Sequence, residues 1–151
     1  MIPTVNKKEV LLQQQKIMKD WGYEIVFEND REANYCGKLL VCTNNKFSSG
    51  GKFHYHLQKT ETFFVISGIL LLEKVDSDCK IKSMFLNVGD SFQIKPGVLH
   101  RFKSFSQVAK FIEASTYDRP EDSYRIWYDD FLKQEDNNLK DLKTKNSKEE
   151  I

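Results

Sequence analysis

The stretch of chain that decides the fold is GGKFHYHLQKTETFFVISG, which runs from Gly50 to Gly68. It carries His54 and His56, two of the three histidines in the protein. Alternate residues of a β-strand point to the same face of a sheet, so the two imidazoles are expected to project together. With the nearby carboxylate of Glu61 they form a donor set that suits a divalent transition metal such as Mn, Fe, Co, Ni or Zn.

The third histidine closes a second stretch, GDSFQIKPGVLH, which runs from Gly89 to His100. Pro96 and Gly97 turn the chain immediately before the strand that would present the His100 ring. A single histidine in a strand is more often a packed or surface residue than a metal ligand. Here every histidine of the protein lies in a strand pattern, and two of them have the HxH spacing before a glutamate. Metal binding is therefore the favoured interpretation.

Short β-like segments fill the chain from Gly22 to about Ser115. The breaks between them carry Asn, Asp, Ser, Gly and Pro, which are the residues typical of turns. Many short strands at this spacing predict an all-β barrel or sandwich. The expected strands cover residues 23–27, 35–43, 52–57, 62–66, 69–74, 80–86, 91–94, 99–103 and 108–115.

Helices are expected on both sides of the strands. Asn6 is a suitable cap for a short helix over residues 6–19, with a glutamate three positions later. After Pro120, apolar residues from Tyr124 to Leu132 recur at helical spacing and predict a helix that packs on the barrel or forms a dimer contact. The chain then divides into an N-terminal helical segment (1–20), a barrel with its packed C-terminal helix (21–132) and a charged tail, either frayed helix or mobile (133–151).

The composition bounds the class of protein. The chain has 151 residues, of which 40% are hydrophobic, as expected for one compact domain. Its 23 Lys and Arg against 22 Asp and Glu give a net charge of +1, which argues against a nucleic-acid or anionic-membrane surface. No stretch is long and apolar enough to span a bilayer, and no secretory leader is expected. The three cysteines (Cys36, Cys42 and Cys79) form no CxxC and indicate free thiols in a reducing cytoplasm.

The two stretches resemble the paired motifs of the cupin superfamily. The first cupin motif has HxH, four residues, Glu, six residues and Gly, and the second runs from Gly-Asp through a proline and glycine turn to His. Mild departures at Ser48, Lys95 and Ser104 concern turns and not ligands. The resemblance implies a cupin double-stranded β-helix (jelly-roll barrel) that binds one divalent transition metal inside it through His54, His56, Glu61 and His100.

A narrower resemblance covers about Trp21 to Ile126. The segments 35–41, 59–63 and 113–116, with the Trp-Gly pair that opens this range, look like D-lyxose isomerases and the small sugar cupins related to type II mannose-6-phosphate isomerase. The resemblance implies an aldose–ketose isomerase that acts on a sugar or sugar phosphate. The insertion usual in D-lyxose isomerases is short here, which leaves the exact substrate open.

Aldose–ketose isomerisation needs a base for the carbon acid and an electrophile for the enediolate oxygens. A divalent metal with open positions meets the second need. Glu113 is the best candidate base, because it lies in an apolar run where burial would raise its pKa. Lys59 lies two residues before Glu61 and offers a cation to a substrate oxygen. For both residues, a solvent-facing position remains the alternative.

Other polar residues near the predicted site keep two interpretations each. Lys38 points into the barrel mouth or extends to solvent. Asp118, Arg119 and Asp122 follow the final strand and either close one side of the pocket or lie outside it. Tyr55 alternates with the two histidines and is expected to point away from the metal.

The leading hypothesis is a metal-dependent cupin that isomerises a sugar or sugar phosphate. An Fe(II)-dependent cupin dioxygenase is the first alternative, since three histidines and a carboxylate also suit iron and oxygen chemistry. A carbohydrate-binding cupin without turnover is the second. Open sheet edges and the aromatic face after Pro120 are compatible with a homodimer, and no nucleic-acid or membrane partner is expected.

Overall fold

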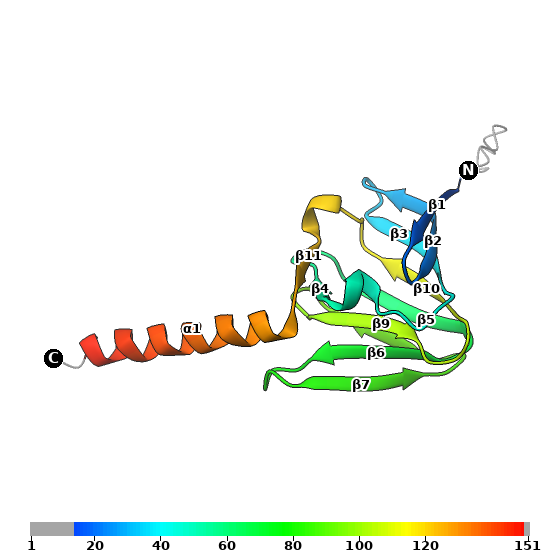
Figure 1. Ribbon diagram of the computed structural model, residues 1–151. Coiled ribbons are helices and arrows are strands. Elements are labelled where there is room, and N and C mark those ends of the chain that lie inside the picture. The colour runs from blue at the N-terminus through cyan, green and yellow to red at the C-terminus, as the bar shows by residue number, and fades with distance from the viewer. Residues whose placement is uncertain (1–13, 150–151) are drawn as a thin grey trace.

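Two antiparallel β-sheets face each other in the computed structural model, which describes residues 14–149 (Figure 1). The chain passes repeatedly from one sheet to the other, so the predicted all-β jelly-roll architecture is confirmed. The first sheet has the order β1 (Gln15–Lys19), β2 (Gly22–Asp30), β3 (Tyr35–Cys42), β10 (Ala109–Ser115), β5 (Glu61–Ser67) and β8 (Ser91–Ile94). The second has the order β11 (Tyr124–Ile126), β4 (Phe53–Tyr55), β9 (His100–Ser104), β6 (Leu70–Val75) and β7 (Ile81–Leu86).

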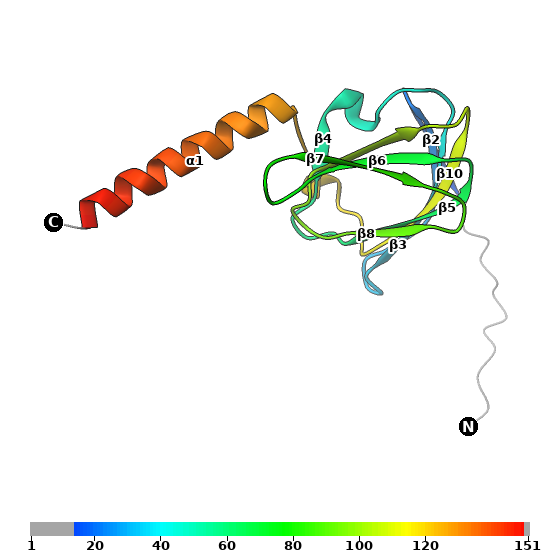
Figure 2. The same cartoon turned by 90° about the horizontal axis from the view of Figure 1, so that it is seen from below.

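Within residues 14–149, helical structure is confined to three segments. Two are short 3₁₀ turns, η1 (Ser48–Gly51) and η2 (Pro120–Asp122), and the third is the helix α1 (Tyr128–Glu149). In both views α1 extends away from the sheets (Figures 1 and 2). Within residues 14–149, no helix is long and apolar enough to cross a membrane.

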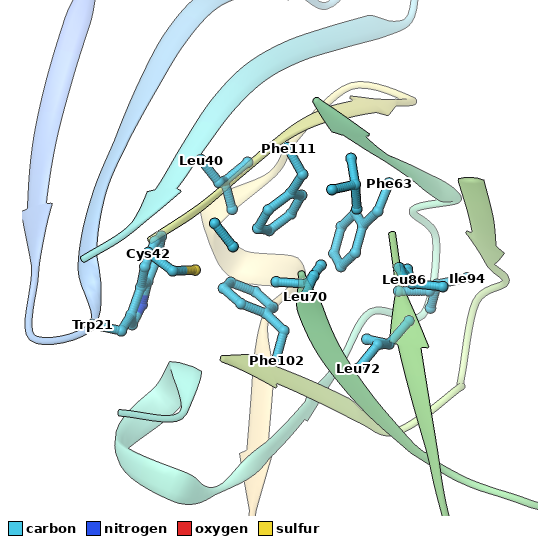
Figure 3. Close-up of a cluster of buried hydrophobic side chains, with 12 residues drawn as sticks. Trp21, Leu40, Cys42, Phe63, Leu70, Leu72, Leu86, Ile94, Phe102 and Phe111 are labelled. Carbon is cyan, nitrogen blue, oxygen red and sulfur yellow. The ribbon is translucent and has the colours of Figure 1, made fainter. Parts of the chain in front are cut away.

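The space between the sheets is filled by aromatic and aliphatic side chains (Figure 3). Phe63, Phe102 and Phe111 come from β5, β9 and β10, and their ring centroids lie 4.8–5.8 Å apart. The Trp21 ring meets Phe102 edge-on at 5.1 Å. Burial of these rings supplies most of the driving force that holds the two sheets together.

The inward-facing side chains of the central strands are apolar at one end of the barrel and charged at the other. On β5 the buried positions are Glu61, Phe63 and Val65, and on β10 Phe111 is followed by Glu113. The alternation that packs the core at one end of the barrel therefore also places charged groups inside it at the other end. This polar end is where the functional residues gather.

The glycine that ends the first motif is required by the backbone. Gly68 has φ of +73°, a conformation that other residues adopt only with strain. A Cβ at this position would lie 2.1 Å from the carbonyl oxygen of Val108. The turn between β5 and β6 therefore excludes a side chain here.

The expected N-terminal helix is wrong where it can be checked. Residues 15–19 form β1, an edge strand that pairs antiparallel with β2. The segment is mostly exposed and polar, so its sequence carries no strand-like alternation and pairing with β2 decides its conformation. The rest of the expected helix, residues 6–13, lies outside the described residues.

The C-terminal helix begins later and runs further than expected. Residues from Tyr124 to Ile126 form β11 on the edge of the second sheet, and the helix starts at Tyr128. It continues through the segment expected to be a frayed or mobile tail. The Tyr128 ring lies 6.1 Å from that of Phe53, and the Tyr124 ring stacks on Tyr55 at 5.2 Å, so aromatic residues of β11 and of the first turn of α1 contact the barrel.

Candidate metal centre and its cavity

The four predicted metal ligands come from two paired strands of the second sheet, β4 and β9, the loop that follows β4, and one strand of the first sheet, β5. His54 lies in β4 and His56 follows it, while Glu61 opens β5 and His100 opens β9. His54 and His100 are directly opposed residues of two paired strands, and their ring centroids are 3.9 Å apart. One ligand atom from each of His54, Glu61 and His100 lies within 4.8 Å of the other two. These three residues could hold one metal ion.

The fourth predicted ligand, His56, lies at the edge of this group. Its Nε2 is 3.6 Å from Oε1 of Glu61, and its ring centroid is 5.5 Å from that of His54. Its Nδ1 makes a hydrogen bond to the carbonyl oxygen of Asp122, which orients the ring. Because a carbonyl only accepts, Nδ1 carries the proton and Nε2 keeps the lone pair that a metal requires.

The hydrogen-bonding state of the donor atoms also suits a metal site. His54 Nδ1, Glu61 Oε2 and His100 Nε2 are buried and have no hydrogen-bond partner. The last two lie 3.0 Å apart, although their alignment is not that of a hydrogen bond. His100 Nδ1 donates to the carbonyl of Val98 at 2.9 Å, which leaves Nε2 as an acceptor. Buried acceptors without a donor are costly, and a cation between them would satisfy all three.

The protonation states around the site favour metal binding. Burial lowers the pKa of His54 well below its usual range, and the neighbouring His100 adds to the effect. Burial also lowers the pKa of His56. Burial alone would raise the pKa of Glu61, but His100 and Lys59 overcome it and hold this pKa well below the usual range. Neutral imidazoles and an ionised carboxylate are the forms that bind a metal.

Lys59 is buried and connects the metal ligands to further carboxylates. Its Nζ lies 2.9 Å from Glu61 Oε1, 3.1 Å from Asp118 Oδ1 and 3.2 Å from Glu113 Oε2. Lys38 is buried as well, with its Nζ 2.7 Å from Asp118 Oδ2 and 3.7 Å from Glu113 Oε2. Burial favours the neutral amine, yet the carboxylates raise the pKa of both lysines above the ordinary value. Both therefore stay charged inside the barrel.

Glu113 lies in this network on β10, with 4% of its surface exposed. Burial raises its pKa to about 7, and the charge of Glu61 adds to the rise, while Lys59 and Lys38 oppose it. A carboxyl group that titrates near neutral pH can both accept and release a proton. The alternative of a solvent-facing Glu113 is thereby excluded.

The segment after β10 closes one side of the site. Asp118 is tied to Asn29 in β2 by two hydrogen bonds of its backbone, at 2.9 and 3.0 Å. Asp122 does not reach the cavity, and its carboxylate instead accepts the N–H groups of Leu57 (2.8 Å) and Gln58 (3.0 Å). Asp122 thus fixes the loop that holds His56.

A cavity of about 420 Å³ opens over these groups. It contains the sequence-predicted His54, His56, Glu61, Lys59 and Glu113, and His100 lies directly behind them, fully buried. Tyr55 points away from the metal site, as expected, and stacks on Tyr124 at 5.2 Å. The full lining is Lys19, Asp20, Trp21, Glu24, Lys38, Leu40, Ser48, Ser49, His54, His56, Lys59, Glu61, Phe102, Glu113, Asp118, Arg119, Pro120, Ser123 and Arg125.

Sequence reasoning missed four charged residues of the cavity lining. Three of them, Lys19, Asp20 and Glu24, come from β1, β2 and the turn between these strands, and the fourth is Arg125. It lies in β11, directly opposite His54 across the pair with β4. The segment was expected to be helical, and no local pattern signals a three-residue strand. Only the pairing with β4 brings this guanidinium to the site.

Comparison with known proteins agrees with this architecture. The family described as "Cupin domain" matches residues 46–113. A search of curated proteins gave no match to this chain. Among solved structures, CapF, a capsular polysaccharide assembling protein from Staphylococcus aureus, is 16% identical with a TM-score of 0.66, and the match covers 76% of this chain and 34% of CapF.

Two further structures have the same fold. Oxalate decarboxylase from Bacillus subtilis is 16% identical with a TM-score of 0.63, and the match covers 75% of this chain and 30% of that protein. KdgF from Halomonas sp. is 13% identical with a TM-score of 0.58, with 73% of this chain and 90% of KdgF covered. This chain therefore spans about a third of the length of the first two proteins.

Identities this low establish the fold alone. The match over residues 46–113 contains both motifs and all four predicted ligands, and with the structural neighbours it supports the cupin superfamily. The class that fold and site define is a cupin-fold protein with a His-His-Glu site able to bind a metal.

Proposed function

We propose that this protein is a metal-dependent enzyme that interconverts the aldose and ketose forms of a sugar or sugar phosphate. The observation that carries the proposal is Glu113, a buried carboxyl group with a pKa of about 7. It is bridged by Lys59 to the candidate metal ligand Glu61. A carbon-acid reaction requires such a base beside an electrophilic centre.

His54, His56, Glu61 and His100 would hold one divalent transition metal, for which Mn, Fe, Zn, Ni and Co all suit the donors. When bound, the metal would supply Lewis-acid polarisation of the adjacent hydroxyl and carbonyl oxygens of the substrate. The ring of His100 is held by its hydrogen bond to Val98, so little reorganisation of this ligand is needed.

Glu113 and Lys59 carry out the other two tasks, which are proton transfer and stabilisation of charge on the substrate. Glu113 takes the proton from the hydroxyl-bearing carbon next to the carbonyl and returns it to the former carbonyl carbon. The proton of the hydroxyl group passes to the former carbonyl oxygen, which balances the reaction. Lys59 stays charged because three carboxylates surround it, and it stabilises negative charge that develops on a substrate oxygen. Asp118 and Lys38 hold Lys59 and Glu113 in place through the contacts described above.

Solvent proton exchange tests the proposal. Protein loaded with Mn²⁺ is incubated in D₂O with a panel of free and phosphorylated aldoses and ketoses, and NMR detects deuterium at the carbon next to the carbonyl. Exchange is expected on at least one sugar with the wild type and with Glu32→Gln, an exposed control. It should be lost in Glu113→Gln with the metal retained. Exchange that survives in Glu113→Gln, or no exchange on any sugar with metal bound, contradicts the proposal.

An iron-dependent oxygenase is the second candidate function, because the same set of ligands suits it. Three imidazoles and one carboxylate also suit Fe(II), and neither Glu113 nor Lys59 is needed for that chemistry. Oxygen consumption by the iron-loaded protein in the presence of the sugar panel distinguishes the two. A carbohydrate-binding protein without turnover would bind a panel member and release it unchanged.

We propose further that two copies associate through α1. Leu139 and Leu142 are 55% and 57% exposed on a helix that extends away from the barrel. An antiparallel pair of helices centred on the two leucines would cover them. It would also bring the acidic side chains of Glu135 and Asp136 in one helix near Lys145 in the other.

Sedimentation velocity tests this association. The wild type is expected to sediment as a dimer and Leu139→Lys/Leu142→Lys as a monomer, and a monomeric wild type would contradict the proposal.

A cytoplasmic location is proposed as well, supported by the free thiols of Cys36, Cys42 and Cys79.

A further inference from the structure

Two guanidinium groups line the candidate metal cavity and have no carboxylate partner in the part of the chain whose side chains the structure describes. Arg119 lies in the segment between β10 and η2, and Arg125 lies in β11. Because Arg125 is the cross-strand neighbour of His54, its side chain lies on the same face of the sheet as that candidate ligand. Both arginines therefore belong to the wall of the candidate active site.

The contacts of these arginines leave most of their donors available. Arg125 donates from Nε to Ser49 Oγ at 3.3 Å. Arg119 donates from Nη1 to the carbonyl of Tyr117 at 3.4 Å and lies over the ring of the same residue at 5.1 Å. Among the side chains of residues 14–145, no carboxylate lies within ion-pair distance of either group.

Arg101 provides the contrast. Its Nε lies 2.7 Å from Oε2 of Glu73, its Nη1 donates to the carbonyl of Gly51, and its guanidinium packs between Phe47 and Phe53. The donors of Arg101 are used to hold the second sheet to the loop that contains η1. Those of Arg119 and Arg125 serve no comparable structural contact.

The charges of the cavity lining also bear on which ligand the cavity favours. The lysines of the wall are neutralised within the protein, since Lys38 and Lys59 contact Glu61, Glu113 and Asp118. At the rim, Lys19 pairs with Glu24 at 3.5 Å. The lining contains five basic and five acidic side chains, so a bound divalent metal would leave the cavity with an excess of two positive charges. Such a cavity favours an anionic ligand over a neutral one.

We infer that Arg119 and Arg125 form a binding site for the carboxylate or phosphate group of the substrate. A guanidinium presents two parallel N–H donors, which match the paired oxygens of either group. The substrate class is then an acidic sugar, phosphorylated or carrying a carboxylate, and not a neutral one. This substrate class rests on the proposed function, whereas the anion site rests on the two arginines.

Calorimetric titration tests the inference without requiring turnover. The probes are glucose, glucuronate, glucose 6-phosphate and inorganic phosphate, each added to Zn²⁺-loaded and to metal-free protein. The wild type and Arg31→Gln, an exposed control, should bind the acidic probes more tightly than glucose. In Arg119→Gln/Arg125→Gln, the affinity for acidic probes should fall by about tenfold or more. Comparison of glucuronate with glucose 6-phosphate distinguishes carboxylate from phosphate.

Three results would overturn the inference. They are equal affinity of the wild type for glucose and the acidic probes, absence of binding by every acidic probe, and an unchanged preference in the double variant. The third result would assign the anion to the metal instead of to the arginines. Failure of the proposed function has a different signature: the acidic preference is present and depends on the arginines, but no proton exchange occurs on any sugar.

Discussion

Replacement of Lys59 by methionine should move the titration of Glu113 to higher pH. Burial and the charge of Glu61 raise the pKa of Glu113 to about 7, and Lys59 is the stronger of two lysines that hold it down. Removal of this cation stabilises the neutral carboxyl group, so the pKa of Glu113 rises further. At pH 7 the variant then carries a protonated Glu113 that cannot act as a base.

The distance between the two groups sets the size of the shift. Lys59 Nζ and Glu113 Oε2 are 3.2 Å apart, and two unit charges at this distance attract each other by roughly 5 kcal/mol at an effective dielectric constant of about 20. A pKa shift of one unit corresponds to a free-energy difference of about 1.4 kcal/mol between the two protonation states. Even if relaxation and water entry remove about two thirds of the attraction, the midpoint rises by about one unit or more.

Carbon-13 NMR of metal-free protein labelled at the glutamate carboxyl carbons measures the midpoint directly, with Glu113→Gln to assign the resonance. Lys59→Arg keeps the positive charge and should titrate close to the wild type. Lys38→Met should shift the midpoint the same way but less, because its Nζ is 3.7 Å from the carboxylate. This variant also keeps the test available if Lys59→Met does not fold. A midpoint of Glu113 that stays constant or falls in the methionine variants would refute the electrostatic account.

Three further variants test other parts of the site and the fold. His100→Ala should lose nearly all bound metal, because it removes a buried ligand, and near-full occupancy by elemental analysis would rule out the proposed ligand set. Asp122→Ala removes the acceptor for two backbone N–H groups of the loop after β4 and should lower the free energy of unfolding by about 1–3 kcal/mol in urea denaturation, with weaker metal binding. Gly68→Ala should cost about 1–3 kcal/mol or more by the same measurement, because φ is +73° and the new Cβ meets the carbonyl of Val108. Unfolding free energies equal to the wild type would contradict these two expectations.

The strands of the barrel were predictable because their signal is local. The strand at Ser91–Ile94 has the predicted bounds, and those of β3, β7 and β10 differ by one residue at one end. In each of these segments turn residues mark the ends, and a run rich in apolar residues marks the strand between them. The edge strands β1 and β11 lacked this signal, since each is short and mostly exposed, so pairing with a distant strand determines them.

The sequence by itself predicted an all-β barrel or sandwich, and its resemblance to the cupins added the jelly-roll class and four candidate metal ligands. Spacing along a strand places His54 and His56 on one face, and a strand repeats its geometry every two residues whatever surrounds it. The tertiary structure alone decided how the charges around the metal are connected. Lys38, Glu113 and Arg125 come from β3, β10 and β11, and they line one cavity only because the sheets pair strands that are far apart in the chain. Such contacts depend on the closure of long loops, which leaves no periodic signal in the residues themselves.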